Sequence, residues 1–458
     1  MNFKNKRYGI LGLARSGIAT IDMLLAENAI LYAWDDGEKS RQKAQSQGYR
    51  LTQPHDWPWS NLDGLILSPG IAHTWPKANE WAQKAKGLNI PIISDIYIFT
   101  QKYPNNPTIA ITGTNGKSTT TSLVNFIFEQ LKRPALMGGN IGTAVNLLHP
   151  KNDETIILEL SSYQLEITPD FKPHIAALLN ITPDHLERHG GMENYIKAKS
   201  LIFKNQGKDD IAYVSIDDEF SYKIYRDILE YYPSKTIPVS VKNPTNGGLY
   251  TQDGWLIDDR NNKAQKIFEL KEATFLKGSH NQQNIAFAYG IATSYGLNNQ
   301  DIIEAIKKYK GLKHRQQYLG KLNNISFIND SKATNGEAAA KALSSYKNIL
   351  WLLGGQSKED GIEQCLPFIH NVQKAFIFGQ DKEQFSQMLP SSIKQESFDD
   401  MPKAFLAAIT KAKAQPNNEL VILLSPAAAS FDQFADFEAR GDLFISLYQA
   451  LKGEKAHA

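Results

Sequence analysis

The sequence predicts an α/β protein of three domains built on mostly parallel sheets. Short apolar stretches recur along the chain and alternate with segments whose apolar residues follow the helical period. These stretches lead into glycine-rich or polar turns, as strands of a parallel sheet do before a helix. At 458 residues the chain is long enough for three domains of roughly 150 residues each.

The first domain is expected over residues 1–104. A strand at Tyr8–Leu11 is followed by a glycine turn, and further strands are expected at Leu31–Trp34 and Gly64–Leu67. Near residues 102–107 two prolines among polar residues interrupt the pattern, which places a domain boundary there.

The second domain is expected over residues 105–312 and the third over residues 313–458. In the second domain a strand at Thr108–Thr112 leads into a helix, and apolar runs at 155–160 and 174–181 indicate buried strands. The third domain repeats the pattern at Ile325–Ile328, Ile349–Leu353, Ala375–Phe378 and Leu420–Leu424. Ligands of open parallel sheets bind beyond the carboxyl ends of the strands, where we expect the functional residues.

Composition excludes several classes of protein. The formal net charge of +2 gives no electrostatic reason to expect binding to nucleic acid or a membrane. No apolar run approaches the ~18 residues of a membrane span, and the N-terminal residues 1–17 predict a strand and turn, not a signal peptide. The single cysteine, Cys365, cannot form an intramolecular disulfide, and we expect it to be buried in a protein of the reducing cytoplasm.

The strongest motif is Gly-Thr-Asn-Gly-Lys-Ser-Thr at residues 113–119, between a strand and a helix. Its glycines can present backbone N–H groups to phosphate oxygens at the start of the helix. Lys117 is expected to reach the outer phosphates of a nucleotide, and the Ser118 hydroxyl to bind Mg²⁺. The general phosphate-loop pattern has its first glycine where this chain has Ile111.

Two acidic or imidazole side chains are candidates for the same metal. Glu159 ends a predicted strand of the same sheet, and a carboxylate there can bind Mg²⁺. His185 follows the next strand and could bind the same metal. A lone histidine at such a place is more often a structural residue whose hydrogen bonds are all made within the protein, so both roles of His185 stay open.

Together these segments resemble the Mur ligases, the cytoplasmic enzymes that build the peptide of peptidoglycan. The similar segments are Ala110–Thr119, Glu159–Glu166, Asn180–His185, Gly278–Asn284, Asn329–Asn335 and Ser425–Phe434. The last two are similar to those of the members that add D-glutamate, and they separate the chain from the members that add alanine, diaminopimelate or lysine and from folylpolyglutamate synthases. The resemblance covers nearly the whole chain. It implies a Rossmann-like N-terminal domain that binds a UDP-linked substrate, a central P-loop-type ATPase domain, and a Rossmann-like C-terminal domain that closes over ATP and binds the amino acid.

The resemblance also implies site residues. For ATP these are Gly113, Thr114, Asn115, Gly116, Lys117, Ser118, Thr119, Asn281, Asn284, Arg315, Asp330 and Lys332. For the UDP-linked substrate they are Leu13, Ala14, Arg15, Ser16, Asp35, Ser68, Asn140, Ser161, Gln164 and His185. For D-glutamate they are Thr334, Lys358, Ser430, Phe431 and Phe437.

Two Mg²⁺ ions are expected, and the implied metal ligands are Ser118, Glu159, His185 and Lys199, with Lys199 carbamylated by CO₂. Without the resemblance, Lys199 is one more helix lysine. The implied catalytic residues are Lys117, Glu159, His185 and Lys199.

Three departures from the expected patterns stand out. Ala14 occupies the place of the second glycine of the dinucleotide fingerprint, which argues against NAD. No glutamate stands two residues after Arg315, and Ala428 and Phe431 differ from the commoner choices in the last motif.

The implied activity is ligation through an acyl phosphate. Its substrates would be ATP, D-glutamate and UDP-N-acetylmuramoyl-L-alanine, and the enzyme would be a cytoplasmic monomer with ATP and Mg²⁺ as cofactors. Two alternatives from other classes are an NAD-dependent oxidoreductase and a non-catalytic nucleotide-binding regulator.

Overall fold

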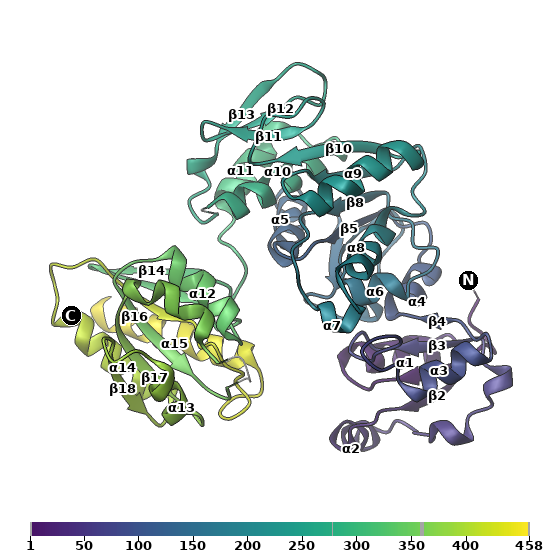
Figure 1. Ribbon diagram of the computed structural model, residues 1–458, viewed down its shortest axis with the longest axis horizontal. Coiled ribbons are helices and arrows are strands. Elements are labelled where there is room, and N and C mark those ends of the chain that lie inside the picture. Colours follow the sequence, from purple (N-terminus) through teal and green to yellow (C-terminus); the bar gives the residue numbers. More distant parts are fainter. Residues whose placement is uncertain (1, 277, 358–360, 457–458) are drawn as a thin grey trace. The chain divides into compact units, whose positions relative to one another are not determined.

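The computed structural model describes residues 2–276, 278–357 and 361–456, and the chain divides into two compact units, Met1–Tyr309 and Lys310–Ala458. Three sheets, parallel in most of their strand pairs, confirm the predicted α/β class (Figure 1). Each of the three predicted domain ranges contains one sheet, while the boundaries at 104/105 and 312/313 stay a prediction.

The first sheet has the strand order β2-β1-β3-β4, and all its pairs are parallel. Its strands are β1 (Arg7–Leu11), β2 (Ile30–Trp34), β3 (Gly64–Leu67) and β4 (Ile92–Ile93), and its helices are α1 (Arg15–Ala26), α2 (Glu38–Ser46), α3 (Glu80–Gly87) and α4 (Asp95–Lys102). The three strands predicted here are confirmed, each starting within one residue of its expected position.

The nine-stranded sheet has the order β13-β12-β11-β10-β9-β8-β5-β7-β6. Its strands are β5 (Thr108–Thr112), β6 (Ala135–Gly139), β7 (Thr155–Glu159), β8 (Ile175–Leu178), β9 (Ile211–Ser215), β10 (Lys235–Ser240), β11 (Leu249–Gln252), β12 (Trp255–Asp258) and β13 (Gln265–Glu269). The pairs from β6 to β11 are parallel, and β11 to β13 form an antiparallel meander.

Helices cover both faces of this sheet because its central strands are apolar on both sides. Along β5, Ile109 and Ile111 pack with α5 (Lys117–Gln130), α10 (Ser279–Ser294) and α11 (Asn299–Lys308). Ala110 packs on the opposite face, which is covered by a second set of helices (Figure 1). These include α6 (Ser162–Glu166), α8 (Met192–Ser200) and α9 (Glu219–Tyr231), and the short α7 (Leu186–His189) precedes α8.

The unit 310–458 contains a six-stranded sheet with the order β14-β15-β19-β16-β17-β18. Its strands are β14 (Gln317–Leu322), β15 (Ile325–Asn329), β16 (Ile349–Gly354), β17 (Val372–Phe378), β18 (Lys394–Phe398) and β19 (Leu420–Leu424), all paired in parallel except β14 with β15. Its helices are α12 (Gly336–Ser345), α13 (Lys382–Met388), α14 (Met401–Lys413) and α15 (Phe437–Ala456). The four predicted strands are confirmed, and Cys365 is buried as expected.

Short 3₁₀ segments complete the described elements: Pro54–Asp56, Trp59–Asn61, Val145–Leu147, Leu201–Phe203, Leu270–Glu272 and Glu363–Asn371. In the part of the chain that the structure describes, no helix has the length and apolar character needed to cross a membrane.

Candidate active site

The predicted phosphate loop joins β5 to α5, in the strand–loop–helix order that the sequence indicated. Every residue of β5 is buried, and α5 begins at Lys117. Gly116 has φ +85°, and a Cβ there would lie 2.5 Å from Asn284 Oδ1, so neither the backbone nor the space admits a larger residue. The first N–H groups of α5 have no partner within the helix, and such a helix start favours an anion.

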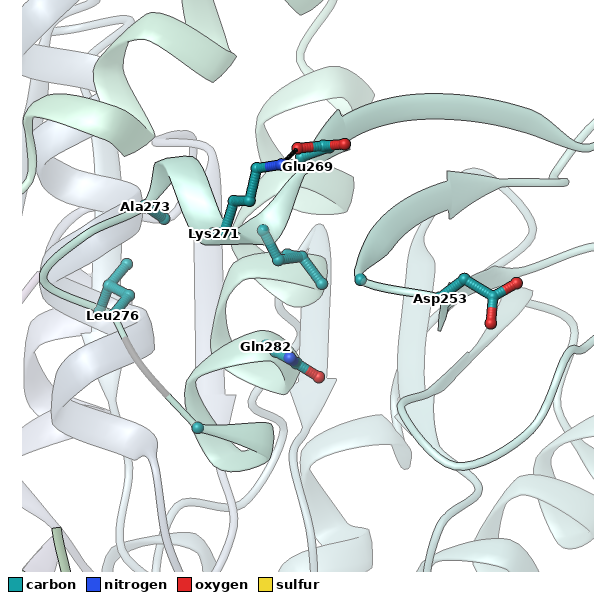
Figure 2. Close-up of a pocket in the computed structure, with 9 residues that line it drawn as sticks. Asp253, Glu269, Lys271, Ala273, Leu276 and Gln282 are labelled. Carbon is teal, nitrogen blue, oxygen red and sulfur yellow. Dashed lines mark ion pairs between the residues drawn. The ribbon is translucent and has the colours of Figure 1, made fainter.

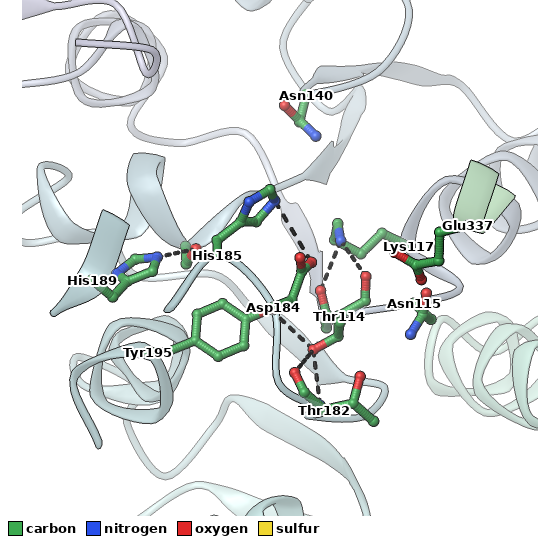
Figure 3. Close-up of polar contacts among 12 residues, drawn as sticks. Thr114, Asn115, Lys117, Asn140, Thr182, Asp184, His185, His189, Tyr195 and Glu337 are labelled. Atoms are coloured by element: carbon green, nitrogen blue, oxygen red, sulfur yellow. Dashed lines mark hydrogen bonds and ion pairs between the residues drawn. The ribbon is translucent and has the colours of Figure 1, made fainter. Parts of the chain in front are cut away.

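Lys117 folds back over this loop (Figure 3). Its Nζ donates hydrogen bonds to the carbonyl oxygens of Gly113 and Thr114, both at 2.8 Å. The ammonium group is therefore held beside the backbone that would surround phosphate oxygens.

Glu159 ends β7, which pairs with β5, so its carboxylate lies at the same sheet edge as the loop. The residue is 2% exposed. Its Oε1 accepts a hydrogen bond from Asn140 Nδ2 at 2.9 Å, whereas its Oε2 is buried and has no hydrogen-bond partner among the described residues. A buried carboxylate oxygen without a donor suits a cation, and this donor chemistry fits Mg²⁺.

Lys199 on α8 reaches the same loop from the other side. It is 1% exposed, and its Nζ donates to Gly113 O at 2.8 Å, the oxygen that Lys117 also contacts. Burial lowers the pKa of Lys199 well below its usual value, and the nearby Lys117 ammonium lowers it further. The carboxylates of Asp184 and Glu159 act in the opposite direction. A lowered pKa favours the neutral amine, which is the form that reacts with CO₂.

His185 lies at the start of α7 in the left-handed region, with φ +52°. Its side chain is 57% exposed, and its Nε2 lies 3.6 Å from Asp184 Oδ2 (Figure 3). Ser118 is almost fully buried in the first turn of α5. Over residues 2–276, 278–357 and 361–456, no three His, Cys, Asp or Glu side chains are gathered closely enough to hold a metal ion. The four-residue metal set stays a prediction.

The structure brings Asn281 and Asn284, two of the residues predicted to bind ATP, to the phosphate loop. Asn284 Oδ1 accepts a hydrogen bond from Thr120 Oγ1 of α5 at 3.0 Å, and Asn284 Nδ2 donates to Asn281 Oδ1 at 3.0 Å. Asn180, after β8, bridges the same region: its side chain exchanges hydrogen bonds with the backbone of Asn115. Residues from two distant segments of sequence, after β8 and in α10, thus contact the loop and the first turns of α5.

A cavity of about 420 Å³ lies beside the start of α10 (Figure 2). It is lined by Asp253, Gly254, Glu269, Leu270, Lys271, Ala273, Leu276, Gly278 and Gln282. Gly278 and Gln282 share one helical face at spacing i, i+4, and Asn281 and Asn284 lie on another. The cavity is therefore beside these two predicted ATP residues and does not include them.

The predicted residues of the first sheet gather at the carboxyl ends of β1 to β3. The Asp35 carboxylate accepts hydrogen bonds from Leu13 N at 2.7 Å and Gly37 N at 2.8 Å, which holds the turn after β1. Ser68 Oγ donates to Gly12 O in that turn at 3.3 Å. Ala14 is the first residue before α1, and Ala14 and Arg15 are exposed, while Ser16 is half-buried.

Ser161 and Gln164 begin α6 and bond to each other. The Ser161 N–H donates to Gln164 Oε1 at 3.1 Å, and the Gln164 N–H donates to Ser161 Oγ at 3.3 Å, a reciprocal cap of the helix start. Gln164 is 2% exposed. This geometry explains both residues structurally, and their contact with substrate stays a prediction.

In the unit 310–458, Asp330 lies at the end of β15 and is 4% exposed. Its Oδ2 accepts from Ser425 Oγ at 2.7 Å, and its Oδ1 accepts from the Gln316 N–H at 3.0 Å. Burial raises the pKa of Asp330 to about 7, against the effect of these hydrogen bonds. Arg315 is exposed, and Lys332 Nζ lies 5.4 Å from the centroid of the Phe437 ring.

Among the residues predicted to bind D-glutamate, Thr334 follows β15, Ser430 and Phe431 follow β19, and Phe437 begins α15. Ser430 is 2% exposed, Thr334 and Phe437 are half-buried, and Phe431 is 70% exposed. Lys358 lies outside the described residues.

Sequence reasoning missed Arg440, which is fully buried in α15. Its Nη2 donates to the carbonyl oxygens of Ser331 at 2.9 Å and Ala428 at 3.0 Å, and its Nε donates to Ser331 Oγ at 3.0 Å. Burial lowers the pKa of Arg440 to about 10. An arginine near the start of a helix, followed by Gly441, gives no sequence signal that distinguishes it from a solvated one.

Comparison with known proteins supplies the family. The model of the Mur ligase middle domain matches residues 111–292. The chain is 40% identical over 448 residues to the UDP-N-acetylmuramoylalanine--D-glutamate ligase of Paramagnetospirillum magneticum, covering 98% of this chain and 97% of that one. It is also 40% identical to the enzyme of that name from Rickettsia bellii, covering 98% of both. The chain belongs to the Mur ligase family.

Solved structures of the family share its fold. The UDP-N-acetylmuramate-alanine ligase of Thermotoga maritima matches with a TM-score of 0.58 and 18% identity, over 97% of this chain and 99% of that one. A UDP-N-acetylmuramoyl-L-alanyl-D-glutamate--2,6-diaminopimelate ligase matches with a TM-score of 0.55 and 18% identity, over 91% of this chain and 90% of that one. The resemblance inferred from the motifs is confirmed at the level of the family.

Proposed function

We propose that this Mur ligase joins D-glutamate to UDP-N-acetylmuramoyl-L-alanine, with ATP converted to ADP and phosphate, in the synthesis of the peptidoglycan precursor of the cell wall. Relatives that span almost the whole chain bear the name of this activity. The observation that supports it most directly is the phosphate loop, where the Gly113 carbonyl oxygen accepts hydrogen bonds from Lys117 and Lys199. Near them, one carboxylate oxygen of Glu159 has no hydrogen-bond partner among the described residues.

The first step is activation of a carboxylate. An oxygen of the substrate's alanine carboxylate attacks the γ-phosphorus of ATP, and the bond from that phosphorus to the oxygen bridging to the β-phosphate breaks. ADP is released, and the carboxylate has become an acyl phosphate. Two anions must meet in this step, so fixed positive charge determines the rate. Lys117, held at the loop, supplies one such charge and follows the phosphoryl group.

The second step forms the amide. The neutral amine nitrogen of D-glutamate attacks the acyl carbon and phosphate leaves with the bonding electrons. The nitrogen then loses one proton and keeps the other in the amide. Thr334, Lys358, Ser430, Phe431 and Phe437 form the amino-acid pocket in this proposal. The C-terminal residues close over the nucleotide, which excludes water that would hydrolyse the acyl phosphate.

Two Mg²⁺ ions screen the phosphates when they are bound. Ser118, Glu159, His185 and carbamylated Lys199 would hold them, and the unpartnered Glu159 Oε2 is the observation that favours this set. Carbamylation joins Lys199 Nζ to the carbon of CO₂ and releases one proton. It converts a buried amine into a hard anionic ligand.

The remaining parts of the proposal concern the UDP-linked substrate and the state of the enzyme. The residues that contact that substrate in this proposal are Leu13, Ala14, Arg15, Ser16, Asp35, Ser68, Asn140, Ser161, Gln164 and His185. The enzyme acts as a cytoplasmic monomer on small molecules and binds no nucleic acid.

ADP production by the purified chain tests the proposal. With ATP, Mg²⁺ and UDP-N-acetylmuramoyl-L-alanine, D-glutamate should support rapid ADP release, and L-glutamate, glycine and L-lysine should not. Omitting the UDP-linked substrate is the control for background ATP hydrolysis. Absence of ADP release with D-glutamate would contradict the proposal.

A further inference from the structure

A buried histidine, His189, joins several elements behind the phosphate loop. It ends α7 and is 1% exposed. Its Nε2 lies 2.9 Å from Ser162 Oγ, and its Nδ1 lies 3.3 Å from Glu166 Oε1. An ionised carboxylate only accepts, so Nδ1 carries a proton toward Glu166 and a neutral ring accepts the Ser162 proton at Nε2. Both nitrogens of the ring are therefore bonded to side chains of α6, at its first and last residues. Figure 3 shows the His189 ring and one of these two contacts.

Two tyrosines pack against the same imidazole. The Tyr163 ring is stacked on it, with centroids 5.1 Å apart and planes 16° apart, and the Tyr195 ring lies 5.2 Å away. The His189 ring is thus fixed by two hydrogen bonds and by contact with two aromatic rings.

Each tyrosine continues to a residue of the candidate active site. The Tyr163 ring centroid lies 5.5 Å from that of His185. The Tyr195 hydroxyl lies 3.0 Å from Thr114 Oγ1 in the phosphate loop, and Lys199 Nζ lies 4.8 Å from the Tyr195 ring centroid. Through one neighbour each, His189 therefore reaches His185, Thr114 and Lys199.

The local backbone makes such an anchor necessary. The α7 segment has His185 at φ +52° before it and Gly190 and Gly191 at φ +70° and +122° after it. A single helical turn between three left-handed residues has few internal hydrogen bonds. Side-chain contacts must then define where His185 lies.

Ser162, His189 and Glu166 are the residue types that form the nucleophile, the base and the acid of a catalytic triad, and they are bonded in that order. Ser162 is only 3% exposed, and a nucleophile must reach a substrate carbonyl. This burial argues against a hydrolytic role and for a structural one.

We propose that His189 is a positioning residue for the ligase reaction. It holds Tyr163 and Tyr195 in place, and through them it sets the position of His185 and Lys199 beside the phosphate loop. This inference rests on the proposed function, because that function gives His185 and Lys199 their chemical roles.

The decisive variant is His189→Phe, which keeps an aromatic ring between the tyrosines and removes both hydrogen bonds. We expect kcat to decrease about 10- to 100-fold, since a displacement of ~1 Å at reacting groups costs up to about 100-fold. KM for ATP and for D-glutamate should change less than about threefold, because other residues bind them. His189→Asn, whose amide can still donate to Glu166, should recover part of kcat.

A second readout does not depend on turnover. With ¹³C-labelled bicarbonate, the parent protein should give a lysine carbamate signal in ¹³C NMR that is absent in Lys199→Ala and weakened in His189→Phe. A parent without this signal would contradict the carbamate in the proposed function, and the kinetic comparison would still decide the role of His189.

Ile228→Ala serves as the matched control for stability. Ile228 is 1% exposed in α9 and belongs to the same apolar cluster as Tyr195. Below its own unfolding temperature this variant should keep the parent kcat. The inference is wrong if kcat of His189→Phe stays within about threefold of the parent, or if KM for ATP and KM for D-glutamate both rise together with the loss of kcat. A parent chain without ligase activity would refute the proposed function instead.

Discussion

The Gly113 carbonyl oxygen accepts hydrogen bonds from two lysines at 2.8 Å, and the two residues differ in what surrounds them. Lys117 lies in the first turn of α5 and is half-buried, so its charge can be hydrated or paired with phosphate. Lys199 is almost fully enclosed, and burial together with the Lys117 charge lowers its pKa. Two lysines that contact one carbonyl oxygen therefore differ in their surroundings, and the lowered pKa of Lys199 makes its neutral form easier to reach than that of an exposed lysine.

Lys117→Ala should abolish turnover while the chain stays folded, because no other residue of the loop can follow the transferring phosphoryl group with a positive charge. Steady-state ADP release and far-ultraviolet circular dichroism measure the two properties. The exposed Lys151→Ala serves as the control and should match the parent. A Lys117→Ala rate within about threefold of the parent, with an unchanged spectrum, would remove the loop from the mechanism.

Lys199→Ala should lose most of the activity, and acetate should restore part of it by occupying the vacated anionic position. The control is Lys197→Ala, which changes an exposed lysine on the same helix. This variant should have the ADP-release rate of the parent, and acetate should not change that rate. Rates with and without acetate provide the test. Full activity of Lys199→Ala, or an unmodified native mass under high bicarbonate, would contradict the carbamate.

At the scale of elements, neighbouring parallel strands bring distant residues into contact where they end. β15 and β19 pair with Asn329 opposite Leu424, so Asp330 and Ser425 meet directly after them. The guanidinium of Arg440 in α15 then binds carbonyls that follow both strands. Two strand ends and one helix thus fix the loops on which the amino-acid pocket is proposed.

Asp330 should make the stability of the unit 310–458 depend on pH. Burial raises its folded pKa to about 7, above the ordinary aspartate pKa of 3.8 that applies in the unfolded chain. Between these two values the folded state keeps a proton that the unfolded state releases. This group's contribution to stability is therefore greatest below about pH 4, decreases as pH rises to about 7 and is constant above that. Thermal unfolding of the parent and of Asp330→Asn between pH 4.5 and 8 (roughly the span of the titration) measures it. The variant should lose part of the pH dependence; identical profiles would show that Asp330 is ionised in the folded state.

Across the whole molecule, the sequence predicted what depends on local pattern. Buried strands such as β5 and β16 are continuous apolar runs, and the motifs that follow strands lie at the sheet edges where they were expected. The strands that were not predicted are β4, β6, β9 to β14 and β18. Of these, β10 contains Pro238 and β18 is largely exposed, so neither gives an apolar run, whereas β9 is a buried strand that the pattern did not single out.

Residues defined by distant partners could not be predicted. His189 stands among charged residues in Leu186–His189, a pattern typical of a surface turn. Its partners Ser162 and Glu166 are 27 and 23 residues away, and only the folded chain brings them together. Arg440 likewise bonds to residues more than ten positions distant, so its burial has no local signal.

The proposed assignment of substrates to different parts of the chain predicts that their kinetics can be changed separately. Lys358→Ala and Ser430→Ala should raise KM for D-glutamate by roughly 10- to 100-fold, since a charge-assisted hydrogen bond contributes about 1.5–3 kcal/mol. KM for ATP and for UDP-N-acetylmuramoyl-L-alanine should change far less, because their proposed contacts lie mainly within residues 1–309. Replacing the exposed Lys347 by alanine is the control and should leave all three KM values unchanged.

If KM for D-glutamate stays constant while KM for ATP rises, Lys358 contacts the nucleotide and the pocket lies elsewhere. If the parent uses L-glutamate or glycine as well as D-glutamate, the proposed amino acid is wrong, and membership of the Mur ligase family is unaffected because it rests on similarity over the whole chain.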